Sequence, residues 1–145
     1  GKIKPKPRLK KKSAKETQEI PTGTETILYV EDDPVVLMIG LSMLESLGYE
    51  VLEAKNGSSG LTILKKKRHI DILLSDVVMP GGMSGVELAQ KAVALRPQIK
   101  VLLATGYSPE EVAQYVDGAP SPTIEKPYRK RELALKVREI LDEAG

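Results

Sequence analysis

Short apolar runs alternate along this chain with stretches of helical periodicity, and this alternation restricts the fold more than any other feature. The apolar runs, which are typical of buried strands, are residues 26–30, 49–54, 70–75, 99–105 and 121–126. The stretches typical of helices are residues 34–47, 57–67, 85–95, a stretch beginning at Ser108, and residues 129–143. Strands that alternate with helices pair in parallel and bury both faces. We therefore expect an α/β fold with a doubly wound, five-stranded parallel sheet that has helices on both faces.

Capping signals support the predicted ends of the helices. Asp33 stands before Pro34, so we interpret Asp33 as a helix cap rather than a ligand. Ser84 and Glu87 have the spacing of a capping box. Gly48 directly follows the last apolar residue of the first helical stretch, as at many helix ends.

Composition excludes several classes of protein. The 145 residues include no cysteine, so the chain has neither disulfides nor thiolate metal ligands. No apolar run reaches the roughly 18 residues that a membrane span needs. Tryptophan and phenylalanine are absent, which makes a base-stacking surface for nucleic acid unfavourable. We expect one globular domain in the cytoplasm, without a membrane span.

Charge divides the chain into a basic tail and an acidic body. Eight of the 22 lysines and arginines precede the first acid, Glu16. The remainder of the chain therefore contains 14 basic and 20 acidic residues. We interpret residues 1–24 as a flexible basic linker or tail and residues 25–145 as the folded domain. The alternative is a nucleic-acid-binding module that acts through the tail, which predicts steep salt dependence.

Polar side chains stand where the predicted strands end. Glu31 and Asp32 follow the first strand, Asp76 the third, Thr105 ends the fourth and Lys126 the fifth. In parallel α/β sheets these ends meet at the edge where ligands bind. Clustered carboxylates favour a hard divalent cation such as Mg²⁺, and a hydroxyl with an ammonium suits phosphoryl oxygens. The pattern suggests attack by a carboxylate on phosphorus, which gives an aspartyl phosphate.

Four motifs in order resemble the receiver domain of bacterial two-component response regulators. They are "ILYVEDDP", "LLSDVVMPGGMSG", "LLATGYS" and "EKPY", and the resemblance extends over residues 25–143. It implies the flavodoxin-like strand order 2-1-3-4-5. It also implies that Asp76 is the phosphoacceptor, that Mg²⁺ is held by Glu31, Asp32, Asp76 and the backbone carbonyl of Val78, and that Thr105 and Lys126 bind the phosphoryl group.

The resemblance also assigns residues that tune the switch. Gly106 matches a small residue that leaves room for the phosphoryl group, and Lys126–Pro127 matches a peptide bond that is usually cis. Thr123 stands where the family usually has a rotating aromatic residue, and we expect Tyr107 to take over part of that role.

These features predict a phosphoacceptor that promotes its own phosphorylation and dephosphorylation, rather than an enzyme with a separate substrate. We expect the donor to be a histidine kinase or a histidine phosphotransfer domain, and the chain to be the receiver of a hybrid sensor histidine kinase. A stand-alone response regulator is the alternative, and a homodimer through the last two helices is a further expectation. An aspartate-nucleophile phosphatase is disfavoured because Val78 replaces its second acid, and His69 is not expected to be the phosphodonor.

Overall fold

The computed structural model describes residues 19–67, 69–106, 110 and 121–143. Its strands form one sheet in the order β2-β1-β3-β4-β5, and every neighbouring pair is parallel. The strands are β1 (Thr26–Val30), β2 (Glu50–Ala54), β3 (Ile72–Asp76), β4 (Lys100–Thr105) and β5 (Thr123–Glu125). The predicted fold class and strand order are confirmed; the limits of β1 match the prediction, and those of the other strands differ by at most two residues.

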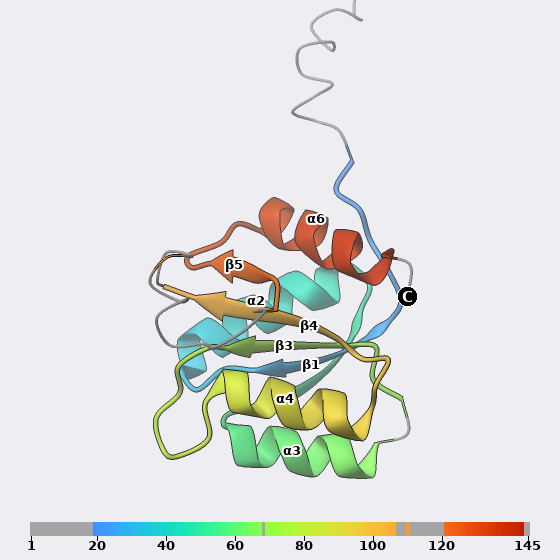
Figure 1. Cartoon of the computed structure of the whole chain (residues 1–145). Coiled ribbons are helices and arrows are strands. Elements are labelled where there is room, and N and C mark those ends of the chain that lie inside the picture. Colours follow the sequence, from blue (N-terminus) through green and yellow to red (C-terminus); the bar gives the residue numbers. More distant parts are fainter. Residues whose placement is uncertain (1–18, 68, 107–109, 111–120, 144–145) are drawn as a thin grey trace, which may run out of the picture.

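Helices cover both faces of the sheet (Figure 1). Two of them, α2 (Pro34–Ser46) and α6 (Lys130–Leu141), lie on one face, whereas α3 (Gly57–Lys66) and α4 (Gly85–Leu95) lie on the other. The helix predicted to begin at Ser108 lies outside the described residues, except for Glu110, which is helical. Among the described helices, none has both the length and the apolar character that a membrane span requires.

The predicted caps hold the helix ends. The Asp33 carboxylate accepts hydrogen bonds from the backbone N–H groups of Val35 at 2.9 Å and Val36 at 3.2 Å, so the cap interpretation is confirmed. Gly48, which follows Leu47 at the end of α2, adopts a φ of +102°, a conformation that glycine adopts without steric cost. Ser84 accepts a hydrogen bond from the Glu87 N–H at 3.1 Å and caps α4.

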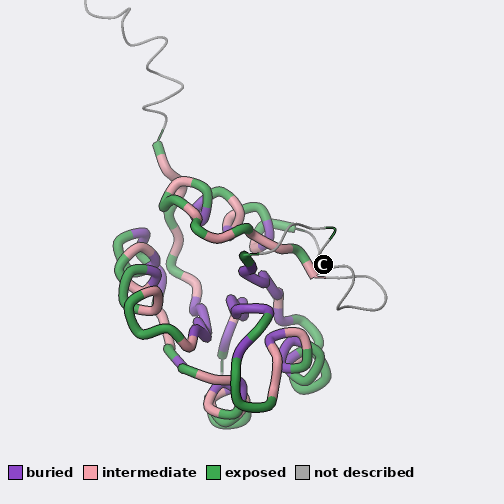
Figure 2. Tube along the Cα trace, turned by 90° about the vertical axis from the view of Figure 1, so that its left-hand side faces the viewer, coloured by how far each residue is buried: buried purple, intermediate pink, exposed green. Residues whose placement is uncertain are grey.

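Two apolar clusters, one on each face, form the core. One cluster joins the side chains of α2 and α6 to the sheet, and the other joins those of α3 and α4. Every residue of β1 and β3 is buried, which explains why their sequences are almost continuously apolar. Figure 2 shows this arrangement, with buried strands enclosed by helices whose outer surfaces are exposed.

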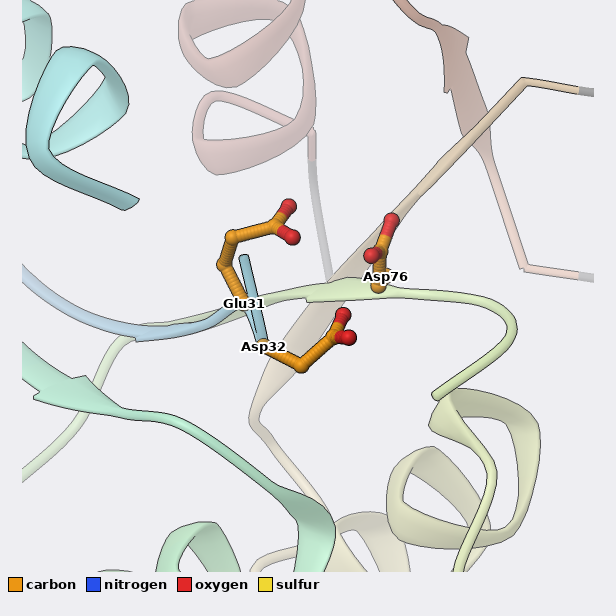
Figure 3. A group of neighbouring side chains, drawn as sticks. All are labelled: Glu31, Asp32 and Asp76. Atoms are coloured by element: carbon orange, nitrogen blue, oxygen red, sulfur yellow. The ribbon is translucent and has the colours of Figure 1, made fainter. Parts of the chain in front are cut away.

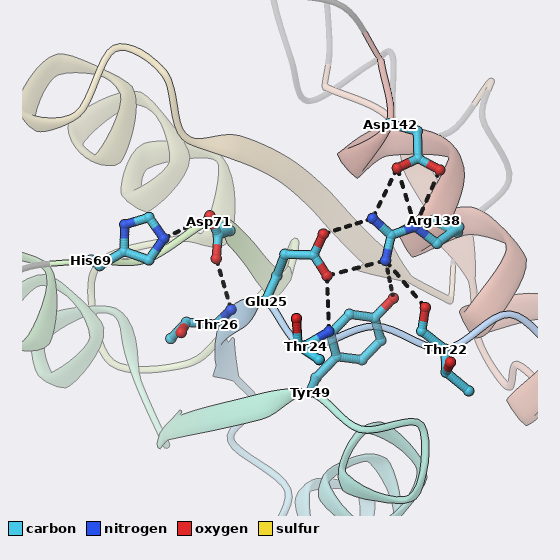
Figure 4. Close-up of polar contacts among 9 residues, drawn as sticks. All are labelled: Thr22, Thr24, Glu25, Thr26, Tyr49, His69, Asp71, Arg138 and Asp142. Carbon is cyan, nitrogen blue, oxygen red and sulfur yellow. Dashed lines mark hydrogen bonds and ion pairs between the residues drawn. The ribbon is translucent and has the colours of Figure 1, made fainter.

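Arg138 of α6 ties the segment before β1 to the amino edge of the sheet (Figure 4). Its guanidinium lies 2.6 Å from Glu25 Oε2 and 2.8 Å from Asp142 Oδ1, and it donates to the Tyr49 hydroxyl at 3.3 Å. The hydrogen bond from Arg138 lowers the pKa of Glu25 to about 2. This network fixes where the chain enters the sheet.

His69 lies at this same amino edge. Its Nε2 atom is 2.9 Å from Asp71 Oδ1, and the other Asp71 oxygen accepts a hydrogen bond from the Thr26 N–H at 2.8 Å (Figure 4). Because the strands are parallel, His69 is at the opposite edge from Asp76, the last residue of β3.

Candidate functional site

Three carboxylates gather at the carboxyl edge of the sheet. Glu31 and Asp32 directly follow β1, and Asp76 ends β3, which is the neighbouring strand. One carboxylate oxygen from each residue lies within 4.8 Å of the others, and the three groups surround one space (Figure 3). The structure therefore brings together the acids that the sequence analysis selected, in the oxygen-rich arrangement that Mg²⁺ prefers.

Lys126 reaches the same cluster from the segment after β5. Its Nζ atom donates to Asp76 Oδ1 at 3.0 Å and to Glu31 Oε1 at 3.1 Å. The Lys126–Pro127 peptide bond is cis, as the resemblance implied. The Lys126 ammonium thus bridges Glu31, which follows β1, and Asp76, which ends β3.

Burial dominates the electrostatics of the site. Burial raises the pKa of Asp76 to about 7; the hydrogen bond from Lys126 opposes this rise and the charge of Glu31 adds to it. For Lys126, burial lowers the pKa, but the bonds to Asp76 and Glu31 outweigh burial, so its pKa lies above the ordinary value. At neutral pH without metal, the Lys126 ammonium is charged, and Asp76 ionises less readily than an ordinary carboxyl group.

The backbone of Asp76 is held by two residues that the sequence analysis did not select. The Ser75 hydroxyl donates to the Asp76 carbonyl at 2.9 Å. Gly85, the first residue of α4, packs so closely that a Cβ there would overlap the same carbonyl, and its N–H donates to the Val77 carbonyl at 2.8 Å. The only signal in the sequence was a glycine after a serine cap, which does not indicate contact with β3.

The other predicted site residues that the structure describes lie at or near this edge. Thr105 ends β4 and is buried, and a Cβ on the neighbouring Gly106 would meet none of the described atoms within 4 Å. Val78, two residues beyond Asp76, has an exposed side chain. Thr123 begins β5 opposite Leu103 and is partly buried. Tyr107 lies outside the described residues.

Comparison with known proteins gives a family match. The family model of the response regulator receiver domain matches residues 27–138. The sensor kinase CckA of Brucella abortus is 36% identical over 123 residues, which are 83% of this chain and 13% of the kinase. The response regulator receiver protein CpdR of the same organism is 32% identical over 117 residues, which are 79% of this chain and 95% of CpdR. The chain thus spans a small part of CckA and almost all of CpdR.

Solved structures show the same fold. A CheY-like receiver domain protein from Methanospirillum hungatei is 35% identical, with a TM-score of 0.72 over 83% of this chain and 95% of that one. The response regulator TrrA of Thermotoga maritima, solved in complex with Mg²⁺ and BeF, is 28% identical, with a TM-score of 0.68 over 81% of this chain and 99% of that one.

Proposed function

Because this chain belongs to the response regulator receiver domain family, we propose that it accepts a phosphoryl group on Asp76 from the phosphohistidine of a histidine kinase or of a histidine phosphotransfer domain. Receiver domains are phosphoacceptors of two-component systems rather than enzymes that turn over a separate substrate. One observation carries the proposal. The Asp76 carboxylate lies 3.0 Å from the Lys126 ammonium and within 4.8 Å of oxygens from two further acids.

The acids at this edge fit Mg²⁺. The carboxylates of Glu31, Asp32 and Asp76 and the backbone carbonyl of Val78 would hold the ion, since all are hard oxygen donors. When bound, Mg²⁺ would neutralise negative charge on the phosphoryl oxygens. The Mg²⁺–BeF complex of TrrA, a relative with the same fold, supports this assignment.

The residues of the chain supply the remaining chemistry. An oxygen of ionised Asp76 attacks phosphorus, the P–N bond to the donor imidazole breaks, and its electron pair returns to that nitrogen. The Lys126 ammonium and the Thr105 hydroxyl bind the phosphoryl oxygens as charge shifts onto them. Water later attacks phosphorus, which releases inorganic phosphate and restores the carboxylate of Asp76.

Phosphorylation would then shift a two-state equilibrium. Thr105 moves toward the phosphoryl group, and Gly106, beside which no described atom would meet a Cβ within 4 Å, leaves room for that group. Thr123 offers no aromatic ring for the usual coupled rotation, so Tyr107 takes part of this role. If Tyr107→Ala keeps the full phosphorylation-dependent change in amide NMR shifts, Tyr107 has no such role.

We further propose that the chain is the receiver of a cytoplasmic hybrid sensor histidine kinase, with residues 1–24 as linker and residues 25–145 as receiver. The similarity to the sensor kinase CckA supports this context, and the similarity to CpdR supports the stand-alone alternative. The proposed homodimer would form through α6 and the helix predicted to begin at Ser108, and sedimentation with and without phosphorylation tests it. The nucleic-acid alternative depends on residues 1–15, which lie outside the described residues.

Intact-mass spectrometry tests the phosphoacceptor proposal. The protein is incubated with acetyl phosphate and Mg²⁺, beside Asp76→Asn and, as a matched control, Asp33→Asn, because asparagine also caps helices. We expect one added phosphoryl group in the wild type and in Asp33→Asn, none in Asp76→Asn, and none without Mg²⁺. A phosphoryl group retained by Asp76→Asn would overturn the assignment.

A further inference from the structure

The segment after β5 contacts β1 and the residue that follows it, at two points that are two residues apart on each partner. Lys126 bonds to Glu31 at 3.1 Å, and the hydroxyl oxygen of Tyr128 lies 3.4 Å from that of Tyr29. In the sheet, β3 and β4 separate β1 from β5. These side-chain contacts therefore join two segments that no backbone pairing holds together.

The Tyr29 hydroxyl has a second polar neighbour besides Tyr128. The Tyr29 hydroxyl also lies 3.3 Å from the backbone carbonyl of Val36 in α2, to which it donates. Because a carbonyl only accepts, this bond uses the single Tyr29 proton and leaves its oxygen to accept from Tyr128. Both hydroxyls keep their protons at neutral pH, because the ordinary pKa of a tyrosine is about 10. A chain of two hydrogen bonds thus connects Tyr128 to α2 through Tyr29.

Gly40 makes room for this arrangement. A Cβ at residue 40 would overlap the Tyr29 hydroxyl and ring, so the buried tyrosine occupies space that another side chain on α2 would need. Beside the contact is an apolar cavity of about 350 Å³, lined by α2 residues and by Lys126, Pro127 and Tyr128. Val36 and Tyr128 both line this space, and Tyr29 connects them through its contacts with the Val36 carbonyl and the Tyr128 hydroxyl.

We propose that Tyr128 is a positioning residue: through its hydrogen bond to Tyr29 it holds the segment 126–128 where the Lys126 ammonium reaches Asp76. The inference rests on the proposed function, since it assigns the contact a part in phosphoryl transfer to Asp76. The segment needs such support because β5 has three residues and pairs only with β4 at the edge of the sheet. Loss of the hydroxyl would keep the apolar ring but remove the bond to Tyr29, so that the segment 126–128 and the Lys126 ammonium could shift.

The first test measures the rate of phosphorylation by acetyl phosphate at saturating Mg²⁺, followed by intact mass. Tyr128→Phe and Tyr29→Phe are compared with Tyr49→Phe, a matched control that loses a hydroxyl bonded to Arg138 at the opposite edge. We expect a roughly 2- to 10-fold lower rate for Tyr128→Phe and Tyr29→Phe, the range that one net hydrogen bond represents. The double variant should lose little more than either single variant, and Tyr49→Phe should keep the wild-type rate.

A second test does not depend on phosphorylation. NMR detects the Lys126 ammonium only while hydrogen bonds slow the exchange of its protons with water. We expect this signal in the wild type and in Tyr49→Phe, and its loss in Tyr128→Phe, with Mg²⁺ affinity unchanged in all three. An unchanged ammonium signal in Tyr128→Phe overturns the proposal, as does an equal loss of rate in Tyr49→Phe. If the wild type accepts no phosphoryl group, the proposed function fails and the ammonium signal still decides whether Tyr128 positions Lys126.

Discussion

The ammonium of Lys126 lies 3.0 Å from the carboxylate of Asp76, yet Asp76 has a pKa of about 7 rather than an acid's usual value near 4. Burial and the neighbouring charge of Glu31 outweigh the attraction of one lysine. Ionisation of Asp76 is therefore less favourable than that of an ordinary carboxyl group until another positive charge enters the site. This relationship explains why a divalent cation and the lysine would act together there.

Asp76→Asn should stabilise the metal-free protein, and more so at high pH. Between about pH 4 and 7 the folded state binds a proton on Asp76 that the unfolded state lacks, so wild-type stability falls as pH rises through this range. The variant lacks this titration. We expect its advantage in free energy of unfolding to be roughly 1–3 kcal/mol larger at pH 8 than at pH 5, measured by urea unfolding with a chelator. An equal advantage at both pH values would contradict the raised pKa.

Asp32→Asn should weaken Mg²⁺ binding. The variant removes one of three carboxylates within 4.8 Å of one another, and an amide oxygen without negative charge is a weaker ligand for a hard cation. We expect at least a roughly 10-fold loss of affinity by isothermal titration calorimetry. Asp33→Asn serves as the control, because its side chain caps α2, and it should bind Mg²⁺ like the wild type.

Gly40→Ala should destabilise the protein, although alanine is normally the better helix former. In an open helix the change would gain about 1 kcal/mol, but here the new Cβ would overlap the Tyr29 hydroxyl and ring. We expect a net loss of about 1–3 kcal/mol in the free energy of unfolding. Combining it with Tyr29→Val, which removes the ring, should recover stability relative to Tyr29→Val alone. Additive losses would show that the ring is not the obstacle.

Glu25→Gln, at the amino edge of the sheet, should change how the stability of the fold depends on pH in the acid range. Arg138 lowers the pKa of Glu25 from 4.5 to about 2, so this pair stabilises the fold above pH 4.5 and the contribution is lost as pH falls toward 2. We expect the wild type and Glu25→Gln to differ in urea midpoint at pH 6 and to converge near pH 2.5. Glu139→Gln, which removes an exposed acid paired with Lys136, should differ little from the wild type at either pH. A constant difference between the wild type and Glu25→Gln would contradict this assignment.

Much of the site could be predicted because its residues stand at the ends of strands. Glu31, Asp32, Asp76, Thr105 and Lys126 each follow or end an apolar run, and parallel pairing brings such ends to one edge. The Asp33 cap was also predictable, because a capping residue bonds within the first turn of its own helix. The strand limits were less certain, since Asp76 belongs to β3 and β5 is only three residues long.

The sequence by itself determined the alternation of strands and helices, the polar strand ends and the family. Only the tertiary structure decided that Lys126 bridges Glu31 and Asp76, that Gly85 packs on the Asp76 carbonyl, and that Tyr29 reaches Tyr128 beneath Gly40. The physical reason is that periodicity and capping depend on neighbours along the chain. The contact between Tyr29 and Tyr128, which are 99 residues apart, depends on how α2 and the segment after β5 pack over the sheet.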